Sequence, residues 1–189
     1  METNIATEEL PTRNKYAAAE IFVIDDEQLV VDTLTYFLRS AGFENVHGFC
    51  DSSEAISQIR FTRPDVVFTD IRMPGLDGNM ITKMVRSFPH LYSVPIIAIT
   101  ADPNFDVSKS IISAGAESVL IKPVSREILI QRAVQAIDNA ISKEATYDKP
   151  DVEYLVSEEE AKTMSIRPQA YRDESAVERR IRRRSRFRE

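Results

Sequence analysis

The stretch DVVFTDIRMPGLDG at residues 65–78 decides the fold. It begins with a short apolar run that ends in Asp70, and it continues into a loop rich in proline and glycine, as expected for a strand followed by a turn. Runs of the same kind occur elsewhere: IFVID at 21–25, NVHGF at 45–49, PIIAIT at 95–100 and SVLIK at 118–122. Because most of these runs lack polar–apolar alternation, we expect strands buried on both faces, as in a parallel sheet.

The segments between these runs show helical periodicity, most clearly at residues 27–40 and 125–141. Alternation of strand and helix, repeated along the chain, predicts an α/β fold: a doubly wound parallel sheet with helices on both faces. Gly42 and Gly115 lie where helices are expected to end. The apolar residues that share a face are Val30, Leu34, Phe37 and Leu38 in the first helix, and Leu129, Ala133, Ala136, Ile137 and Ile141 in the last.

The same patterns divide the chain of 189 residues into three parts. Residues 1–19 lack apolar periodicity and are interpreted as a flexible N-terminal extension, residues 20–143 as the folded domain, and residues 144–189 as a charged C-terminal tail. The tail is too short and too polar for an ordinary DNA-binding winged helix or a catalytic domain. We therefore expect one domain with appendages.

Composition and charge restrict the cellular setting. The formal net charge of −6 argues against nucleic-acid binding by the chain as a whole. A single cysteine, Cys50, cannot form an intramolecular disulfide, and the N-terminus lacks the features of a secretion signal. No apolar run approaches the roughly 20 residues needed to span a bilayer. The prediction is a soluble, cytoplasmic protein with no membrane partner.

Polar residues end four of the five predicted strands. Asp25 and Asp26 end the first, Asp70 the third, Thr100 the fourth and Lys122 the fifth. In open α/β sheets the site lies outside the carboxyl ends of the strands, so we expect these side chains to converge. Clustered carboxylates repel one another unless a cation binds them, and oxygen ligands favour Mg²⁺. A carboxylate beside a metal, a lysine and a hydroxyl make a phosphoryl-transfer site.

The order of these motifs resembles the receiver domain of two-component response regulators. The matching segments are D-D-E at 25–27, D-I-R-M-P-G-L-D-G at 70–78, T-A at 100–101, A-G-A at 114–116 and K-P at 122–123, and the resemblance covers residues 20–143. It implies a flavodoxin-like sheet of order 2-1-3-4-5. It also implies a signalling switch that a histidine kinase or a phosphotransfer protein phosphorylates. The chain would be a response regulator of the stand-alone type, without a recognisable output domain.

The resemblance also implies roles for individual residues. Asp70 is the expected phosphoacceptor. Asp26 is expected to bind Mg²⁺ directly and Asp25 through water, while Arg72 contributes its backbone carbonyl. Thr100 and Lys122 are expected to contact phosphoryl oxygens. The Lys122–Pro123 peptide is expected to be cis, as in the family.

One position departs from the family pattern. Val119 stands three residues before Lys122, where many receivers have a Tyr or Phe that turns inward on activation. Switching is therefore expected to depend on Thr100 and on the backbone. The face formed by the fourth helix, fifth strand and fifth helix is expected to transmit the signal.

The acyl phosphate modifies the protein itself. We therefore do not classify the chain as an enzyme beyond self-phosphorylation and autodephosphorylation. It is expected to be a monomer or a phosphorylation-dependent dimer.

The end of the tail concentrates positive charge. Such a run is either solvated or binds a partner, for which we favour an effector protein and keep nucleic acid as the alternative. The arginines are Arg179, Arg180, Arg182, Arg183, Arg184, Arg186 and Arg188.

Other interpretations of the motif residues remain open at this stage. Asp25 and Asp26 alone could form a turn, Thr100 could cap a helix, and Lys122 could cover apolar surface. An aspartate-based phosphatase of the haloacid-dehalogenase type expects a second Asp where Arg72 stands, and no P-loop motif is present. A scaffold whose tail binds an effector is compatible with the switch. His47 and His90 are expected to be structural, and Cys50 a small buried hydrophobic residue.

Overall fold

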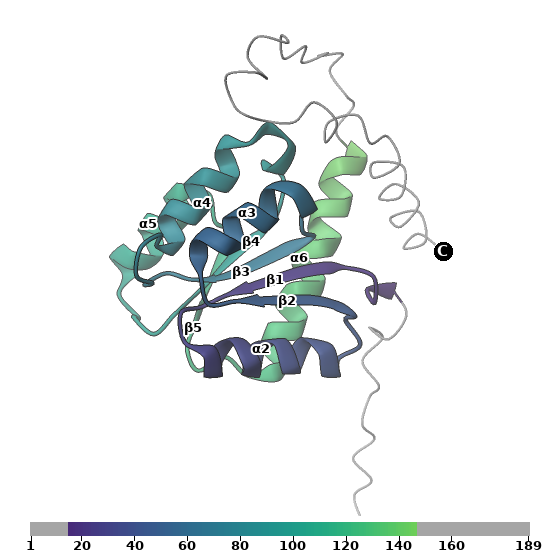
Figure 1. Ribbon diagram of the computed structural model, residues 1–189. Helices are drawn as coiled ribbons and strands as arrows, with labels where there is room; N and C mark the ends of the chain where they lie inside the picture. Colours follow the sequence, from purple (N-terminus) through teal and green to yellow (C-terminus); the bar gives the residue numbers. More distant parts are fainter. Residues whose placement is uncertain (1–14, 147–189) are drawn as a thin grey trace, which may run out of the picture. The chain divides into compact units, whose positions relative to one another are not determined.

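Each of the five apolar runs forms one strand of a single parallel sheet in the computed structural model (Figure 1). The order across the sheet is β2-β1-β3-β4-β5, and every neighbouring pair is parallel. The predicted doubly wound, flavodoxin-like sheet of order 2-1-3-4-5 is therefore confirmed. The strands are β1 (Glu20–Ile24), β2 (Asn45–Phe49), β3 (Val66–Asp70), β4 (Ile96–Thr100) and β5 (Ser118–Ile121).

Helices cover both faces of this sheet, as predicted (Figure 1). Two helices, α2 and α6, lie on one face, and three helices, α3, α4 and α5, lie side by side on the other. A short 3₁₀ helix, η1 (Pro89–Leu91), follows α4. The helices are α2 (Gln28–Ser40), α3 (Ser52–Thr62), α4 (Gly78–Ser87), α5 (Phe105–Ala114) and α6 (Arg126–Thr146).

The structure describes residues 15–146. The predicted N-terminal extension is therefore described only from Lys15 onward, and the predicted tail only where α6 continues past residue 143. Our remaining predictions for residues 1–14 and 147–189, including those for the arginine-rich end, lie outside the described residues.

The segment directly before β1 packs against the domain, whereas we predicted a flexible extension up to residue 19. Tyr16 and Ala19 are buried. The Tyr16 hydroxyl donates a hydrogen bond of 2.6 Å to Oδ2 of Asp138, and Lys15 Nζ lies 3.3 Å from Oδ1 of the same residue. Asp138 belongs to α6, so this contact ties the start of the domain to its last helix. A lone tyrosine outside any periodic run gives no sequence sign of burial.

The two central strands are buried along their whole length, which explains the missing alternation in their sequences. All residues of β3 and β4 are buried. In β1, Phe22 and Ile24 belong to the core that α3, α4 and α5 cover. Ile21 and Val23 are buried too, and because side chains alternate along a strand they face α2 and α6. The ends of β1, β3 and β4 thus meet at a well-packed edge.

The helices differ from the predicted apolar faces in detail. In α6, Leu129, Ala133, Ala136 and Ile137 are buried as expected, and Ile141 is half-buried. In α2, Leu34 and Leu38 are buried as expected, whereas Val30 and Phe37 are only half-buried. Val31 and Thr35 are buried on this helix instead. Within residues 15–146, the helices are too short or too polar for any of them to cross a membrane.

Polar caps begin the helices that follow β2, β3 and β4. The Asp51 carboxylate accepts hydrogen bonds from the N–H groups of Ser53 and Glu54, and Asp77 and Asn104 cap α4 and α5 in the same way. At its other end α5 stops at Gly115, which has a φ of 113°. This left-handed conformation favours glycine, as the sequence predicted.

Candidate functional site

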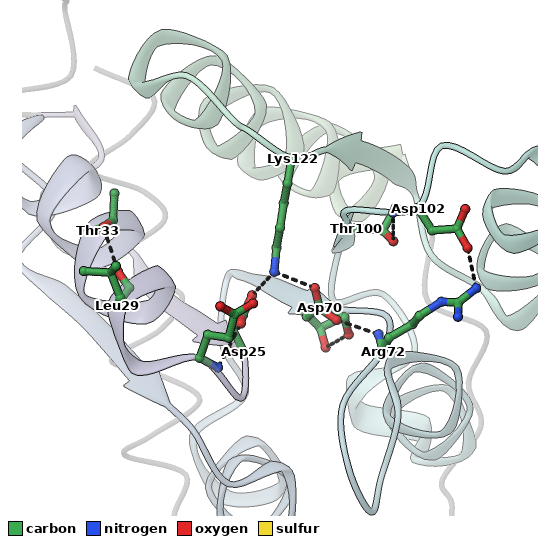
Figure 2. Close-up of polar contacts among 10 residues, drawn as sticks. Asp25, Leu29, Thr33, Asp70, Arg72, Thr100, Asp102 and Lys122 are labelled. Atoms are coloured by element: carbon green, nitrogen blue, oxygen red, sulfur yellow. Dashed lines mark hydrogen bonds and ion pairs between the residues drawn. The ribbon is translucent and has the colours of Figure 1, made fainter.

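The carboxyl ends of β1, β3 and β5 bring three ionisable side chains together (Figure 2). Asp25 directly follows β1, Asp70 is the last residue of β3, and Lys122 directly follows β5. Nζ of Lys122 lies 2.7 Å from Oδ2 of Asp25 and 2.7 Å from Oδ1 of Asp70. Parallel strands end at one edge of the sheet. The predicted convergence of Asp25, Asp70 and Lys122 is therefore confirmed.

The three side chains are shielded from water to different degrees. The side chains of Asp25 and Asp70 are 2% and 7% exposed, and that of Lys122 is 18% exposed. Two carboxylates that are buried this deeply repel each other and are stable only with a cation between them. Lys122 supplies that charge in the structure, so it is not a lysine that merely covers apolar surface.

Burial shapes the acidity of this cluster. It raises the pKa of Asp70 above the ordinary value, although the hydrogen bond and charge of Lys122 and the N–H of Arg72 act in the opposite direction. For Lys122, burial acts to lower the pKa, but the hydrogen bonds and charges of Asp25 and Asp70 outweigh it, and the pKa is raised. Lys122 therefore stays protonated, and the Asp70 carboxylate is more basic than an exposed aspartate.

Hydrogen bonds and close packing hold Asp70 in one orientation. Its Oδ2 accepts a hydrogen bond of 2.5 Å from the backbone N–H of Arg72, while Oδ1 faces Lys122. The loop folds back so that the N–H of Gly78 donates to the carbonyl of Ile71. A Cβ atom at Gly78 would lie 2.4 Å from the carbonyl oxygen of Asp70, which is too close for any side chain. The glycine that ends the 65–78 stretch therefore lets α4 start directly against the predicted phosphoacceptor.

Asp25 and Asp26 have different environments although they are adjacent. Asp25 is buried, and its second oxygen, Oδ1, accepts a hydrogen bond of 3.1 Å from the N–H of Glu27. Asp26 is exposed and lines the hollow above Asp70. The structure therefore separates the two carboxylates into one engaged in the cluster and one open to the hollow.

Thr100 ends β4 in the same region and is buried. Its Oγ1 accepts a hydrogen bond of 3.1 Å from the N–H of Asp102, so the hydroxyl is held by its own loop. Asp102 also accepts, through Oδ1, a hydrogen bond of 2.9 Å from the N–H of Asn104, the residue that caps α5. Thr100 is thereby connected to the start of α5.

An open hollow lies above these residues. The two loops on its rim are joined by an ion pair that our sequence analysis did not predict: Nη2 of Arg72 contacts Oδ2 of Asp102 (Figure 2). Periodicity gives no sign of it, because the two residues belong to separate loops. The hollow is lined by Asp26, Glu27, Asp70, Arg72, Thr100, Ala101, Asp102, Pro103 and Lys122.

The oxygen donors around the hollow fit a small, hard cation. Within residues 15–146, no three acidic, histidine or cysteine side chains are grouped so as to hold a metal ion. The carboxylates of Asp26 and Asp70, however, both line the hollow. Mg²⁺ commonly takes one or two carboxylates and keeps several waters, whereas Ca²⁺ needs more protein oxygens. The donor set therefore fits Mg²⁺.

The other residues that sequence analysis considered lie away from this chemistry. His47 Nε2 contacts Glu20 at 2.9 Å, and His90 Nε2 contacts the carbonyl of Arg60 at 3.2 Å, which are structural contacts. Cys50 is exposed, and our prediction that it is buried is wrong, because it follows β2 at the edge of the sheet. Partial desolvation of the thiol and nearby acidic groups, Asp25 first among them, raise the pKa of Cys50.

Two further features of the region match the sequence analysis. The peptide between Lys122 and Pro123 is cis, as the family resemblance implied. Val119 is half-buried and packs against the core formed with α3, α4 and α5. An aliphatic side chain therefore occupies the place on β5 where many receivers have an aromatic residue.

Comparison with known proteins agrees with this geometry. The family model described as the response regulator receiver domain matches residues 21–134. The chain therefore belongs to the response regulator receiver domain family, a class of domains that act as phosphoacceptor switches in two-component signalling.

Solved structures of receiver domains have the same fold. The chemotaxis protein CheY4 of Vibrio cholerae is 26% identical with a TM-score of 0.60, and the match covers 64% of this chain and 99% of that chain. A response regulator of Chloroflexus aurantiacus is 30% identical with a TM-score of 0.61, covering 64% and 98%. The receiver domain of a sensor histidine kinase from Pseudomonas aeruginosa, with magnesium coordinated in its active site cleft, is 30% identical with a TM-score of 0.60, covering 65% and 99%.

Proposed function

We propose that Asp70 accepts a phosphoryl group from a phosphohistidine of a histidine kinase or phosphotransfer protein. The observation that carries this proposal is the Asp70 carboxylate itself: it is buried and oriented by Lys122 and the Arg72 N–H, yet it lines an open hollow. A phosphoryl donor can therefore approach a carboxylate whose orientation is fixed. The basic character of this carboxylate suits attack on phosphorus.

The proposed transfer moves one phosphoryl group between two side chains. An oxygen of Asp70 forms a bond to phosphorus while the bond from phosphorus to the histidine nitrogen breaks. The electron pair of that bond stays on the imidazole, which takes a proton from solvent. Later, water attacks the phosphorus, the acyl phosphate breaks, and Asp70 regains its carboxylate as inorganic phosphate leaves. The protein is modified in this cycle, so we regard it as a switch and not as an enzyme acting on other molecules.

We further propose that Asp26, Asp70 and the backbone carbonyl of Arg72 hold Mg²⁺, with Asp25 contributing through water. The exposure of Asp26 toward the hollow supports a direct contact, and the engagement of both Asp25 oxygens supports an indirect one. The bound ion would neutralise charge on the transferring oxygens. A magnesium site in the related histidine-kinase receiver is consistent with this proposal.

Magnesium titration tests this part of the proposal. Asp26→Asn should weaken Mg²⁺ binding by about tenfold or more, because losing a direct charged ligand costs at least as much as losing an outer-shell partner. Asp32→Asn is the matched control, since Asp32 is an exposed carboxylate on the following helix, α2, and does not line the hollow. Calorimetry that gives equal affinities for the two variants would remove Asp26 from the metal site.

Lys122 and Thr100 are the proposed contacts of the phosphoryl oxygens. Lys122 already lies 2.7 Å from Asp70, and its charge would balance the added negative charge. Thr100 is proposed to exchange its hydrogen bond from Asp102 for a contact to the phosphoryl group. Because Asp102 also holds Asn104, such a movement would reach the start of α5.

The proposed output surface is formed by α5, β5 and α6. Large apolar side chains are exposed there, which favours contact with a protein partner. We propose that effector binding on this surface or through the arginine-rich residues 179–188 follows phosphorylation, with nucleic acid as the alternative ligand of those arginines. A cytoplasmic monomer, or a dimer formed on phosphorylation, fits this scheme. The exposed apolar residues are Phe105, Ile112, Ile121 and Ile128.

A further inference from the structure

The rim of the hollow is crossed by the ion pair between Arg72 and Asp102 (Figure 2). Arg72 belongs to the loop after β3, and its backbone N–H holds Asp70. Asp102 belongs to the loop after β4, and its N–H holds the hydroxyl of Thr100. The two residues therefore connect the proposed phosphoacceptor to the loop that leads into α5 by a side chain contact on the open side of the site.

Phosphorylation of Asp70 would offer the Arg72 guanidinium a more strongly charged partner than Asp102. A phosphoryl group carries nearly two negative charges and presents several acceptor oxygens, whereas the Asp102 carboxylate carries one charge. Guanidinium groups bind phosphate oxygens through two parallel hydrogen bonds, with more energy than a single contact to a carboxylate. Since the N–H of Arg72 already lies 2.5 Å from Asp70, its long side chain starts beside the place where the phosphoryl group would be attached.

The ion pair is also weak enough to be exchanged. The side chain of Arg72 is 68% exposed and that of Asp102 is 26% exposed. Ion pairs with this exposure contribute little because water and salt screen them. Moving the guanidinium from Asp102 to a more highly charged neighbour requires no change in the buried core.

We propose that Arg72 exchanges partners: its guanidinium pairs with Asp102 while Asp70 is unmodified, and with the phosphoryl oxygens once Asp70 is phosphorylated. This inference rests on the proposed phosphorylation of Asp70. The exchange releases the Asp102 carboxylate from the loop after β3. The segment that contains Thr100 and Asn104 is then free to follow the phosphoryl group.

Beryllofluoride with Mg²⁺ serves as the phosphoryl mimic in the test, which uses the full chain and NMR titration. Asp102→Asn leaves the backbone N–H and one carbonyl acceptor in place but removes the competing charge. It should tighten beryllofluoride binding by up to about fivefold, the range expected for an exposed ion pair. Arg72→Gln should weaken binding, and Arg72→Lys should restore part of the loss.

A double-mutant cycle separates partner exchange from a general effect of removing negative charge. In the Arg72→Gln background, Asp102→Asn should change binding no more than Asp106→Asn does, because Asp106 is an exposed acid on α5 without a contact to Arg72. An equal gain from Asp102→Asn with and without Arg72 would overturn the inference. A loss of affinity in the single Asp102→Asn variant would overturn it as well.

The NMR signal of the Arg72 side-chain Nε–H gives a second readout that a purely structural role would not change. It should shift when beryllofluoride binds to the wild-type protein, together with the amides of Asp102 and Asn104. An Nε–H signal that stays constant while the mimic binds contradicts the exchange. If the wild-type chain does not bind beryllofluoride, or if Asp70→Asn binds it equally well, the proposed function itself is wrong and the inference falls with it.

Discussion

The ammonium of Lys122 lies 2.7 Å from the carboxylate of Asp70, although β4 separates the strands that carry the two residues. The long side chain reaches across the end of β4 to make this contact. The same Nζ atom also lies 2.7 Å from Asp25, so a single cation balances two buried carboxylates. Domain stability and the proposed chemistry therefore depend on the same contact.

Lys122→Met should destabilise the domain by about 3 kcal/mol, because it leaves two buried carboxylates facing each other without a cation. Urea unfolding at neutral pH measures the difference. Lys109→Met is the control, since Lys109 is exposed on α5, and it should change stability by no more than about 0.5 kcal/mol.

Adding Asp70→Asn to Lys122→Met should restore part of the lost stability, because one of the two unbalanced charges is removed. If Lys122→Met is as stable as Lys109→Met, the ammonium does not balance the buried carboxylates and the electrostatic account of the cluster is wrong.

Asp70→Asn alone should stabilise the domain at neutral pH. The pKa of Asp70 is raised in the folded state, mainly by burial, so folding disfavours its ionised form. Below the ordinary value of 3.8 the carboxyl is protonated in both states, and the wild-type chain carries no such cost. As the pH rises through the pKa of the folded state the cost appears in full. The stability difference between variant and wild type should therefore grow with pH across this window.

Thermal or urea unfolding of both proteins from about pH 3.5 to pH 7 measures this dependence. A constant difference across the range, or a variant that becomes less stable than the wild type as the pH rises, would show that burial of Asp70 does not oppose its ionisation.

Gly78→Ala should destabilise the domain by about 2 kcal/mol and should also reduce phosphorylation of Asp70. The added Cβ would lie 2.4 Å from the Asp70 carbonyl oxygen and 2.9 Å from Cα of Ile71, both backbone atoms that cannot move alone. Gly75→Ala is the control: Gly75 has a φ of 79°, but nothing lies within 4 Å of an added Cβ. It should cost about 1 kcal/mol through backbone strain and leave phosphorylation unchanged. Equal phosphorylation of the two variants would mean that Gly78 does not position Asp70.

The sheet and most of the site were predictable because strong local signals carry them. Apolar runs such as the one before Asp70 are long enough to be strands, and parallel strands must end at one edge. The convergence of Asp25, Asp70 and Lys122 follows from that geometry alone. Their individual roles and the strand order came from the family resemblance and not from periodicity.

What could not be predicted depends on contacts between separate loops or on single residues. Arg72 and Asp102 meet because two loops follow adjacent strands, and no sequence pattern marks the pair. Tyr16 is buried and donates a hydrogen bond to Asp138, which lies near the other end of the domain. Cys50 is exposed because it directly follows β2, an edge strand, and the apolar run that it ends gives no sign of that edge position.

Chemical mapping of the phosphorylated residue tests the central claim most directly. The full chain is incubated with Mg²⁺ and a small phosphodonor such as acetyl phosphate, the acyl phosphate is reduced with borohydride to mark its position, and the tryptic peptides are sequenced by mass spectrometry. We predict a single reduced residue at position 70, none without Mg²⁺, and none in Asp70→Asn. A marked residue at any other position in the wild-type chain, or equal phosphorylation of Asp70→Asn, would contradict the assignment of Asp70 as the phosphoacceptor.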